Sequence, residues 1–298
     1  MPTNEQRRAT AKRKLERQLE RRAQQARRRR LYTIIAAAVT AIVVIGAVVA
    51  TVVITNRDSG SKTAAASSAQ STSRAPSPPA NGQLPPFTPA ADLGSNCTYP
   101  ASGTPASKQV NPPRTGKVPT DPAQVSASMA TSQGNMGLQL DNAKAPCTVN
   151  SFASLAQQGY FNDTPCHRLT TTDGLSVLQC GDPSGQGTGG PGYQFANEYP
   201  TNQYQPDDPG LQKPVLYPRG TLAMANAGPG TNGSQFFLVY KDSQLPPDYT
   251  VFGTIDQTGL ATLDKIAAAG VAGTGPDGKP LQDGKPATDV MIKSIRLD

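Results

Sequence analysis

Short segments in which apolar and polar residues alternate dominate the second half of the chain. Alternation with a period of two is typical of β-strands that bury one face. Seven such segments occur, at residues 124–130, 136–140, 176–180, 221–226, 234–240, 249–255 and 289–297. Because most of the intervening segments are short and rich in turn-forming residues, we expect these strands to form an antiparallel sheet.

Two segments have apolar residues at helical spacing instead. In the first, Thr148 is placed to cap the helix, Phe152 lies on its apolar face and Gly159 stands near its end. The second covers residues 259–269, with Gly270 as its stop. About eight strands with two helices predict a mainly β fold, an eight-stranded antiparallel β-barrel capped by the two helices.

An uninterrupted apolar run lies far upstream of this region. Residues 31–55 contain no charged side chain. At about 1.5 Å per residue, a helix of this length crosses a hydrocarbon layer of about 30 Å. We therefore predict a transmembrane helix over residues 31–55. A buried core helix is one alternative, although such a helix rarely lacks a polar face. A cleaved signal peptide is another, and the long charged leader argues against it.

The net charge of +7 is concentrated before the apolar run. Residues 1–30 contain twelve Lys or Arg and three Glu, a net +9, which leaves −2 for the rest of the chain. Positive charge marks the cytoplasmic side of a membrane-spanning helix, so we expect a basic cytoplasmic tail over 1–30 and an extracytoplasmic location after residue 55. A nucleic-acid-binding arm is the alternative for the tail. Attraction to anionic lipid headgroups explains the tail without a nucleic acid partner.

Residues 56–120 are rich in Ser and Ala at first and in Pro later. Such a composition buries too little apolar surface to fold alone. We predict a linker over 56–120 and one folded domain over 121–298. Cys97 interrupts the linker pattern and indicates that the last part of the linker is tied to the domain.

Four cysteines lie in the part of the chain that we expect to be exported: Cys97, Cys147, Cys166 and Cys180. An even number in an oxidising compartment predicts two disulfides. Three pairings are available and the sequence does not choose among them; we favour Cys147–Cys166 with Cys97–Cys180. Zinc binding is the alternative, but the chain has no C-x-x-C motif and a single histidine, His167. We expect neither a metal nor a cofactor.

Several familiar catalytic motifs are missing from the sequence. It contains no G-x-S-x-G, and one histidine gives little support to a serine-hydrolase triad. Residues 185–190 match G-x-G-x-x-G by letter, but Pro191 follows instead of a helix. We therefore interpret this segment as a surface loop and not as a phosphate-binding turn.

Five longer strings provide a more specific signal: CHRL (166–169), LQCGD (178–182), GTGGPG (187–192), MANAGPGTNGSQFF (224–237) and YTVFGTI (249–255). Together they resemble the cyclophilin family of peptidyl-prolyl cis/trans isomerases, especially its bacterial membrane-anchored members, over about residues 124–298. The family fold is an eight-stranded antiparallel β-barrel with a helix at each end. The resemblance implies a monomeric peptidyl-prolyl isomerase that acts on proline-containing polypeptides and assists the folding of exported proteins.

The same resemblance assigns roles to individual residues. Arg168 matches the catalytic arginine of the family, and Gln179 and Gln235 match the two glutamines beside it. Strand alternation separates Phe236 from Phe237, and we assign Phe237 to the proline pocket and Phe236 to the core. The residues that match the pocket and the edge that binds an extended substrate are Val177, Ala225, Asn226, Ala227, Phe237, Leu245 and Tyr249.

The implied chemistry needs no acid–base pair. Rotation about an X–Pro bond meets a barrier of about 18–20 kcal/mol, because the nitrogen lone pair is delocalised into the carbonyl. A guanidinium that stays charged near neutral pH stabilises the twisted amide, while an apolar pocket holds the proline ring. Arginine, glutamines and an apolar pocket are therefore chemically sufficient.

Some positions depart from the family pattern. An aromatic pocket wall is missing, with Leu175 or Ser176 in its place, and Gln244 stands where many members have Trp. Residues 198–218 look like an insertion over one side of the site. These departures support an alternative function, a weakly active or inactive domain that binds Pro-containing segments as an envelope scaffold.

Overall fold

The computed structural model describes residues 82–298, which belong to one compact unit. The predicted cytoplasmic tail and transmembrane helix, residues 1–55, lie outside the described residues, as does the first part of the predicted linker. Between residues 82 and 298, no helix combines the length and the apolar character that crossing a bilayer requires.

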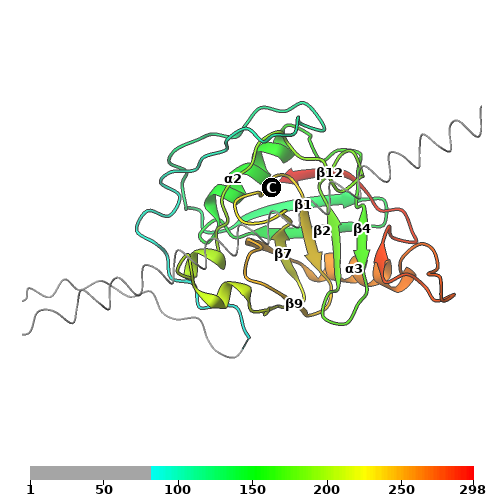
Figure 1. Cartoon of the computed structure of the whole chain (residues 1–298). Helices are drawn as coiled ribbons and strands as arrows, with labels where there is room; N and C mark the ends of the chain where they lie inside the picture. Colours follow the sequence, from blue (N-terminus) through cyan, green and yellow to red (C-terminus); the bar gives the residue numbers. More distant parts are fainter. Residues whose placement is uncertain (1–81) are drawn as a thin grey trace, which may run out of the picture. The chain divides into compact units, whose positions relative to one another are not determined.

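One antiparallel sheet of ten strands dominates the domain (Figure 1). The strand order in this sheet is β11-β4-β5-β8-β7-β10-β2-β1-β12-β3. A second sheet pairs β6 (Val215–Tyr217) with β9 (Ser243–Leu245). The strands of the large sheet are β1 (Val125–Thr131), β2 (Asn135–Leu140), β3 (Thr164–Pro165), β4 (Arg168–Thr170), β5 (Val177–Cys180), β7 (Thr221–Met224), β8 (Phe236–Val239), β10 (Val251–Ile255), β11 (Asp283–Gly284) and β12 (Met291–Leu297).

The two ends of the large sheet meet along one short stretch of chain. Only Cys166 and His167 separate β3 from β4, yet β3 pairs with β12 while β4 pairs with β5. The sheet therefore curls on itself along residues 164–170, and β11 adds to the free edge of β4. The predicted mainly β, antiparallel class with two helices is confirmed. The large sheet has ten strands and not the predicted eight, because residues 164–170 are divided into the two strands β3 and β4 and because β11 is an additional edge strand.

All seven predicted strands are present, with ends that differ from the prediction by at most two residues. The strands that the sequence pattern missed, β3, β4, β6, β9 and β11, contain only two or three residues each. A period of two cannot be read from so few positions. β3 and β4 pair with the longer strands β12 and β5, whereas β6 and β9 pair with each other and β11 pairs with β4.

Two α-helices pack against the large sheet, α2 (Pro146–Gln157) beside β12 and α3 (Gln257–Ala269) beside β2. The start of α3 is capped by the side chain of Asp256, which accepts a hydrogen bond from the Gly259 N–H. The helix ends at Gly270, as predicted, where φ is +78°. Such a backbone angle suits glycine because other residues carry a Cβ that crowds it.

The prediction that Thr148 caps the first helix is wrong. The helix begins at Pro146, so Thr148 lies within its first turn, and the cap residue Ala145 makes no side-chain hydrogen bond. Instead, the buried carboxylate of Glu198 accepts from the N–H groups of Cys147 and Thr148, at 3.0 and 2.7 Å, and from the Thr148 hydroxyl at 2.6 Å. A carboxyl group from another part of the chain thus satisfies the free N–H groups of Cys147 and Thr148 in the first turn, and its burial raises the pKa of Glu198.

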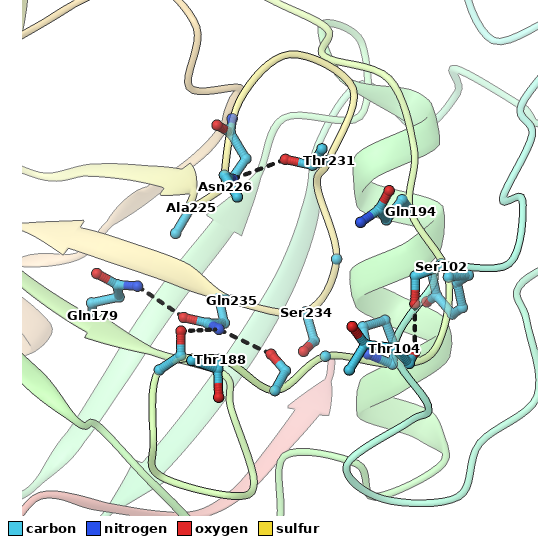
Figure 2. Close-up of a pocket in the computed structure, with 17 residues that line it drawn as sticks. Ser102, Thr104, Gln179, Thr188, Gln194, Ala225, Asn226, Thr231, Ser234 and Gln235 are labelled. Atoms are coloured by element: carbon cyan, nitrogen blue, oxygen red, sulfur yellow. Dashed lines mark hydrogen bonds between the residues drawn. The ribbon is translucent and has the colours of Figure 1, made fainter. Parts of the chain in front are cut away.

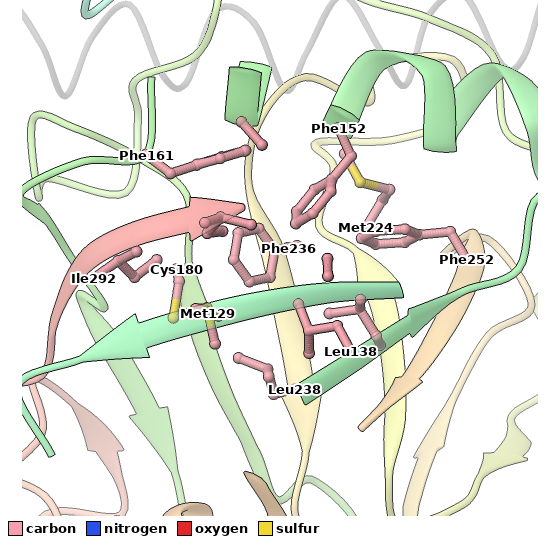
Figure 3. Packing of buried hydrophobic residues seen from close by; sticks show 14 of the residues in the cluster. Met129, Leu138, Phe152, Phe161, Cys180, Met224, Phe236, Leu238, Phe252 and Ile292 are labelled. Carbon is pink, nitrogen blue, oxygen red and sulfur yellow. The ribbon is translucent and has the colours of Figure 1, made fainter. Parts of the chain in front are cut away.

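The main hydrophobic core lies between the curled sheet and the helices (Figure 3). The Phe152 ring from α2 lies 5.4 Å from that of Phe236 and 5.2 Å from that of Phe252. Four leucines on four adjacent strands stand opposite one another and are 0% exposed: Leu169, Leu178, Leu238 and Leu222. Burying each such side chain contributes about 1.5–3 kcal/mol. This row identifies the inner face of the sheet.

Residues 82–120, which the sequence assigned to the linker, pack on the domain in the described structure. Cys97, Tyr99 and Val118 are buried and join the main core. The Tyr99 hydroxyl donates a hydrogen bond of 2.7 Å to the carbonyl of Cys147 at the start of α2. The compact unit therefore extends upstream of residue 121, and Cys97 marks the tie that the sequence indicated.

The disulfide pairing favoured from the sequence is wrong. The structure joins Cys97 to Cys147 and Cys166 to Cys180. The second pair follows from the register of β4 and β5: Arg168 stands opposite Gln179, which brings Cys166 and Cys180 together at the same end of the strand pair. This register was not readable because β4 is only three residues long.

The two disulfides are expected to stabilise the domain unequally. They join cysteines 50 and 14 residues apart in the sequence. On the chain-entropy model, loops of these lengths correspond to about 4 and about 3 kcal/mol. We predict that Cys97→Ser with Cys147→Ser lowers the free energy of unfolding more than Cys166→Ser with Cys180→Ser, as measured by urea unfolding. An equal or smaller loss for the first pair would contradict a role for residues 82–120 in the folded unit.

Candidate active site

The register of the sheet places the predicted functional residues in one row across neighbouring strands. Arg168 on β4 stands opposite Gln179 on β5, Gln179 stands opposite Phe237 on β8, and Phe237 stands opposite Ala223 on β7. Side chains at directly opposite positions point to the same face of a sheet. Since the adjacent row of leucines points into the main core, the side chains of this row lie on the opposite, outer face of the sheet.

Arg168 is held from two sides. Its Nε and Nη2 donate to the two carboxylate oxygens of Asp283 on β11, each at 2.7 Å, and its Nη1 donates to Gln179 Oε1 at 3.2 Å. The hydrogen bonds that Arg168 donates to Asp283 raise the pKa of Arg168, and the same contact lowers the pKa of Asp283. Both groups are therefore charged at neutral pH. The Arg168 side chain remains 40% exposed.

A directed chain of amide hydrogen bonds leads to the guanidinium, and Figure 2 shows its link between Gln235 and Gln179. The Nε2 of Gln235 donates to the carbonyls of Gly187 and Gly189, at 3.1 and 2.9 Å. Its Oε1 is thereby turned towards Gln179, whose Nε2 donates to it at 2.8 Å. Gln179 in turn presents its oxygen to Arg168. Because an amide has one donating and one accepting end, each link determines the direction of the next.

The other end of this chain rests on a buried carboxylate. Asp182 accepts from the N–H and the hydroxyl of Ser184, each at 2.8 Å, and from the Gly189 N–H at 2.9 Å. Burial alone would raise the pKa of Asp182, but these hydrogen bonds outweigh it and the pKa is lowered. A Cβ on Gly189 would lie 2.1 Å from Asp182 Oδ1, so only glycine fits there. The loop over residues 185–190 thus serves to position Gln235.

A small apolar cluster, separate from the main core, surrounds Phe237. Phe236 is 0% exposed in the main core, whereas Phe237 is 4% exposed in this second cluster, so the two rings lie on opposite faces of β8 as expected. The Tyr249 ring stands edge-on to Phe237 at 5.7 Å. The cluster contains four further residues of the predicted pocket and edge, namely Val177, Ala225, Leu245 and Tyr249.

A cavity of about 400 Å³ adjoins this row and is lined by uncharged residues. Five predicted residues line it, namely Gln179, Gln235, Ala225, Asn226 and Ala227, whereas Arg168, Val177, Phe237, Leu245 and Tyr249 do not. The Ala225 N–H donates to the Gln235 carbonyl at 2.9 Å and the Ala227 N–H to Thr231 Oγ1 at 2.8 Å. Among residues 82–298 both the backbone N–H and the C=O of Asn226 have no protein partner, so both groups are free to bind an extended substrate.

Two positions flagged in the sequence take different roles. Leu175 packs against the Phe237 cluster, whereas Ser176 is buried and its N–H donates to Ser243 Oγ at 2.9 Å. Leu175 therefore occupies the wall next to Phe237. The ring nitrogens of His167 are buried without hydrogen-bond partners among the described residues. Burial lowers the pKa of His167, so its ring is neutral at pH 7.

Several residues of the site were not identified from the sequence. Asp283 lies 115 residues from Arg168 and no motif links the two. Asp182 ends the string LQCGD just before the Gly-rich loop, and this position is the one signal in the sequence by which it could have been found. Ser102 and Thr104 line the cavity from the segment expected to be a linker, and nothing in their sequence context indicates this place.

Comparisons with known proteins identify the family to which the folded domain is similar. The family model described as cyclophilin type peptidyl-prolyl cis-trans isomerase/CLD matches residues 126–297. A Mycobacterium tuberculosis protein named probable peptidyl-prolyl cis-trans isomerase B is 71% identical over all of this chain and 95% of the relative. A Mycobacterium leprae protein of the same name is 65% identical over 100% of both chains.

More distant relatives match the folded domain. Peptidyl-prolyl cis-trans isomerase B of Streptomyces anulatus is 37% identical over 59% of this chain and 97% of its own length. The family match covers both helices, every residue of the row that contains Arg168 and all of the strands except Val125, the first residue of β1. The chain therefore belongs to the cyclophilin-type peptidyl-prolyl cis-trans isomerases.

Proposed function

We propose that this isomerase accelerates rotation about X–Pro bonds by using Arg168 to stabilise the twisted amide, and that it assists the folding of exported proteins. The observation that supports the mechanism is the cross-strand row in which Arg168, Gln179 and Phe237 share one face. Cation, orienting amide and aromatic surface follow one another at the spacing of adjacent strands, about 5 Å.

The row suits the electronic change that occurs during rotation. At the twisted state the prolyl nitrogen no longer shares its lone pair with the carbonyl, so it becomes an acceptor that the planar states lack. A guanidinium N–H directed at this nitrogen binds the twisted amide more tightly than either planar isomer, which lowers the barrier. Phe237 and its apolar neighbours hold the proline ring while the preceding residue turns.

The two glutamines act on Arg168 and not on the substrate in this proposal. Gln235 directs Gln179, and Gln179 donates no hydrogen to the guanidinium but accepts one from it. A flexible arginine side chain loses rotamer freedom when it is held in this way. Because Arg168 loses this conformational entropy when the protein folds, the entropy cost does not add to the barrier of the catalysed step.

Replacing Arg168 tests the mechanism directly. We expect Arg168→Ala to lower kcat/KM by roughly 10²–10³-fold, the usual effect of removing one preorganised donor. Arg168→Lys keeps a positive charge but loses the planar fork, so it is also expected to be impaired. The measurement is a protease-coupled isomerisation assay on the full-length protein in detergent.

The matched control for this test is Arg219→Ala. Arg219 makes a bidentate ion pair with Asp264, at 2.7 and 2.8 Å, and its side chain is 38% exposed, but it lies outside the row and the cavity. The Arg219→Ala variant should have the same kcat/KM as the unchanged protein. Full activity of Arg168→Ala would overturn the mechanism.

Neighbouring phenylalanines separate substrate binding from stability. Phe236→Ala should lower the free energy of unfolding by about 3–5 kcal/mol, the usual cost of emptying a core position, with activity per folded molecule retained. Phe237→Ala should cost less stability but raise KM and lower kcat/KM. The measurements are urea unfolding and peptide isomerisation of both variants. The reverse order of effects would show that Phe237 is a core residue only.

A second candidate function is the binding of Pro-containing segments, with only slow isomerisation of the X–Pro bond. The small exposed fraction of Phe237, 4%, favours it, because a proline ring reaches that surface only if neighbouring side chains move. Leu175 in place of an aromatic wall points the same way. Measurable peptide binding that depends on Phe237, with turnover that is insensitive to Arg168→Ala, would favour this candidate.

We further propose that residues 31–55 anchor the chain in a bilayer and that the isomerase domain lies outside the cytoplasm. The apolar run, the +9 charge before it and the two disulfides of the domain support this placement. In spheroplasts of a bacterial host, the domain of the full-length protein should be digested by added protease, and its cysteines should react with maleimide only after reduction. A protected domain with free thiols would contradict the proposal.

A further inference from the structure

The carboxylate that binds Arg168 comes from a part of the chain remote from every motif of the site. Asp283 lies on β11, which pairs with β4 so that Asp283 stands opposite Thr170 and Gly284 opposite Leu169. The strand contains two residues and follows α3 and a long turn-rich segment. The Asp283 side chain contacts the site through the two hydrogen bonds that it accepts from Arg168, both 2.7 Å long.

We propose that Asp283 is a positioning residue for isomerisation, which sets the plane of the Arg168 guanidinium and leaves two of its N–H groups for the rotating amide. This inference rests on the proposed role of Arg168 in the reaction. It assigns to Asp283 a contribution to the catalysed step and none to the binding of the proline ring.

The count of donors supports this assignment. A guanidinium has five N–H groups in one plane. Asp283 uses the one on Nε and one on Nη2, and Gln179 uses one on Nη1. One N–H on Nη1 and one on Nη2 thus have no protein partner among residues 82–298. Two contacts from different directions fix the plane, and with it the direction of the two remaining donors.

The ion pair is better suited to orienting Arg168 than to increasing its charge. A carboxylate beside a guanidinium reduces the net positive charge at the site, so its benefit has to be geometric. The parallel N–H···O bonds of a bidentate pair restrict orientation more than a single contact does. Gln179 alone, through one bond of 3.2 Å, would leave the guanidinium free to rotate about its long side chain.

An ordinary surface ion pair is the competing explanation, because such pairs contribute little. The domain contains a matched example, Arg219 with Asp264, in which two bonds of 2.7 and 2.8 Å join side chains that are 38% and 55% exposed. The Arg168–Asp283 side chains are 40% and 50% exposed. The two pairs differ in that only Arg168 also donates to the directed amide chain and stands in the row with Phe237.

The experiment compares both carboxylates in the full-length protein in detergent. Asp283→Ala should lower kcat/KM roughly 10- to 100-fold, as expected when a reacting group is misplaced, with the loss in kcat and with KM little changed. Asp283→Asn keeps one acceptor oxygen and should be impaired less. Asp264→Asn is the control and should have unchanged kcat and KM. Urea unfolding of each variant shows whether it is folded.

A double-mutant cycle distinguishes positioning from any other effect of Asp283. In the Arg168→Ala background, Asp283→Ala should cause no further loss, because the residue acts through the arginine. Wild-type activity of Asp283→Ala and Asp283→Asn beside an impaired Arg168→Ala would overturn this inference alone. Unchanged activity of Arg168→Ala would overturn the arginine mechanism as well. Higher activity of Asp283→Ala would show that the carboxylate restrains the enzyme, which is the opposite of the proposal.

Discussion

The guanidinium of Arg168, bound on one side by a carboxylate and on the other by an amide oxygen, is the point on which the arrangement of the site depends. Its partners come from β11 and β5, the two neighbours of β4 in the sheet. Register across these short strands therefore decides whether the contacts exist. A slip of one residue in β4 would exchange the outward Arg168 for the buried Leu169 and remove all three hydrogen bonds.

Hydrogen-bond polarity extends the same constraint through the site. A carboxylate only accepts, a guanidinium only donates, and an amide does one at each end. From Asp182 through the Gly187–Gly189 backbone, Gln235 and Gln179 to Arg168 and finally Asp283, each group therefore has a single consistent orientation. The acidic ends of this chain both have a lowered pKa, so the network keeps its polarity throughout the neutral range.

Prediction from the sequence succeeded where periodicity or a long motif was present. The seven long strands, the stop at Gly270 and the separation of Phe236 from Phe237 follow from alternation and backbone preference, and the family follows from MANAGPGTNGSQFF. It failed where contacts join residues that are remote in the sequence. The Cys166–Cys180 pairing and the contact of Asp283 with Arg168 depend on the register of two- and three-residue strands, which the sequence pattern does not reveal. The capping of α2 by Glu198 depends on a residue outside any strand, about 50 positions downstream, and no local pattern points to it.

The two disulfides act on the parts of the fold that define the site. Cys166–Cys180 ties the ends of β4 and β5, which carry Arg168 and Gln179, so it limits slippage of the register on which those side chains depend. Cys97–Cys147 ties the upstream segment that lines the cavity through Ser102 and Thr104. Short strands provide few hydrogen bonds of their own, and a covalent link near them offsets this weakness. The proposed location outside the cytoplasm and the geometry of the site are therefore connected, because an oxidising environment is what maintains both links.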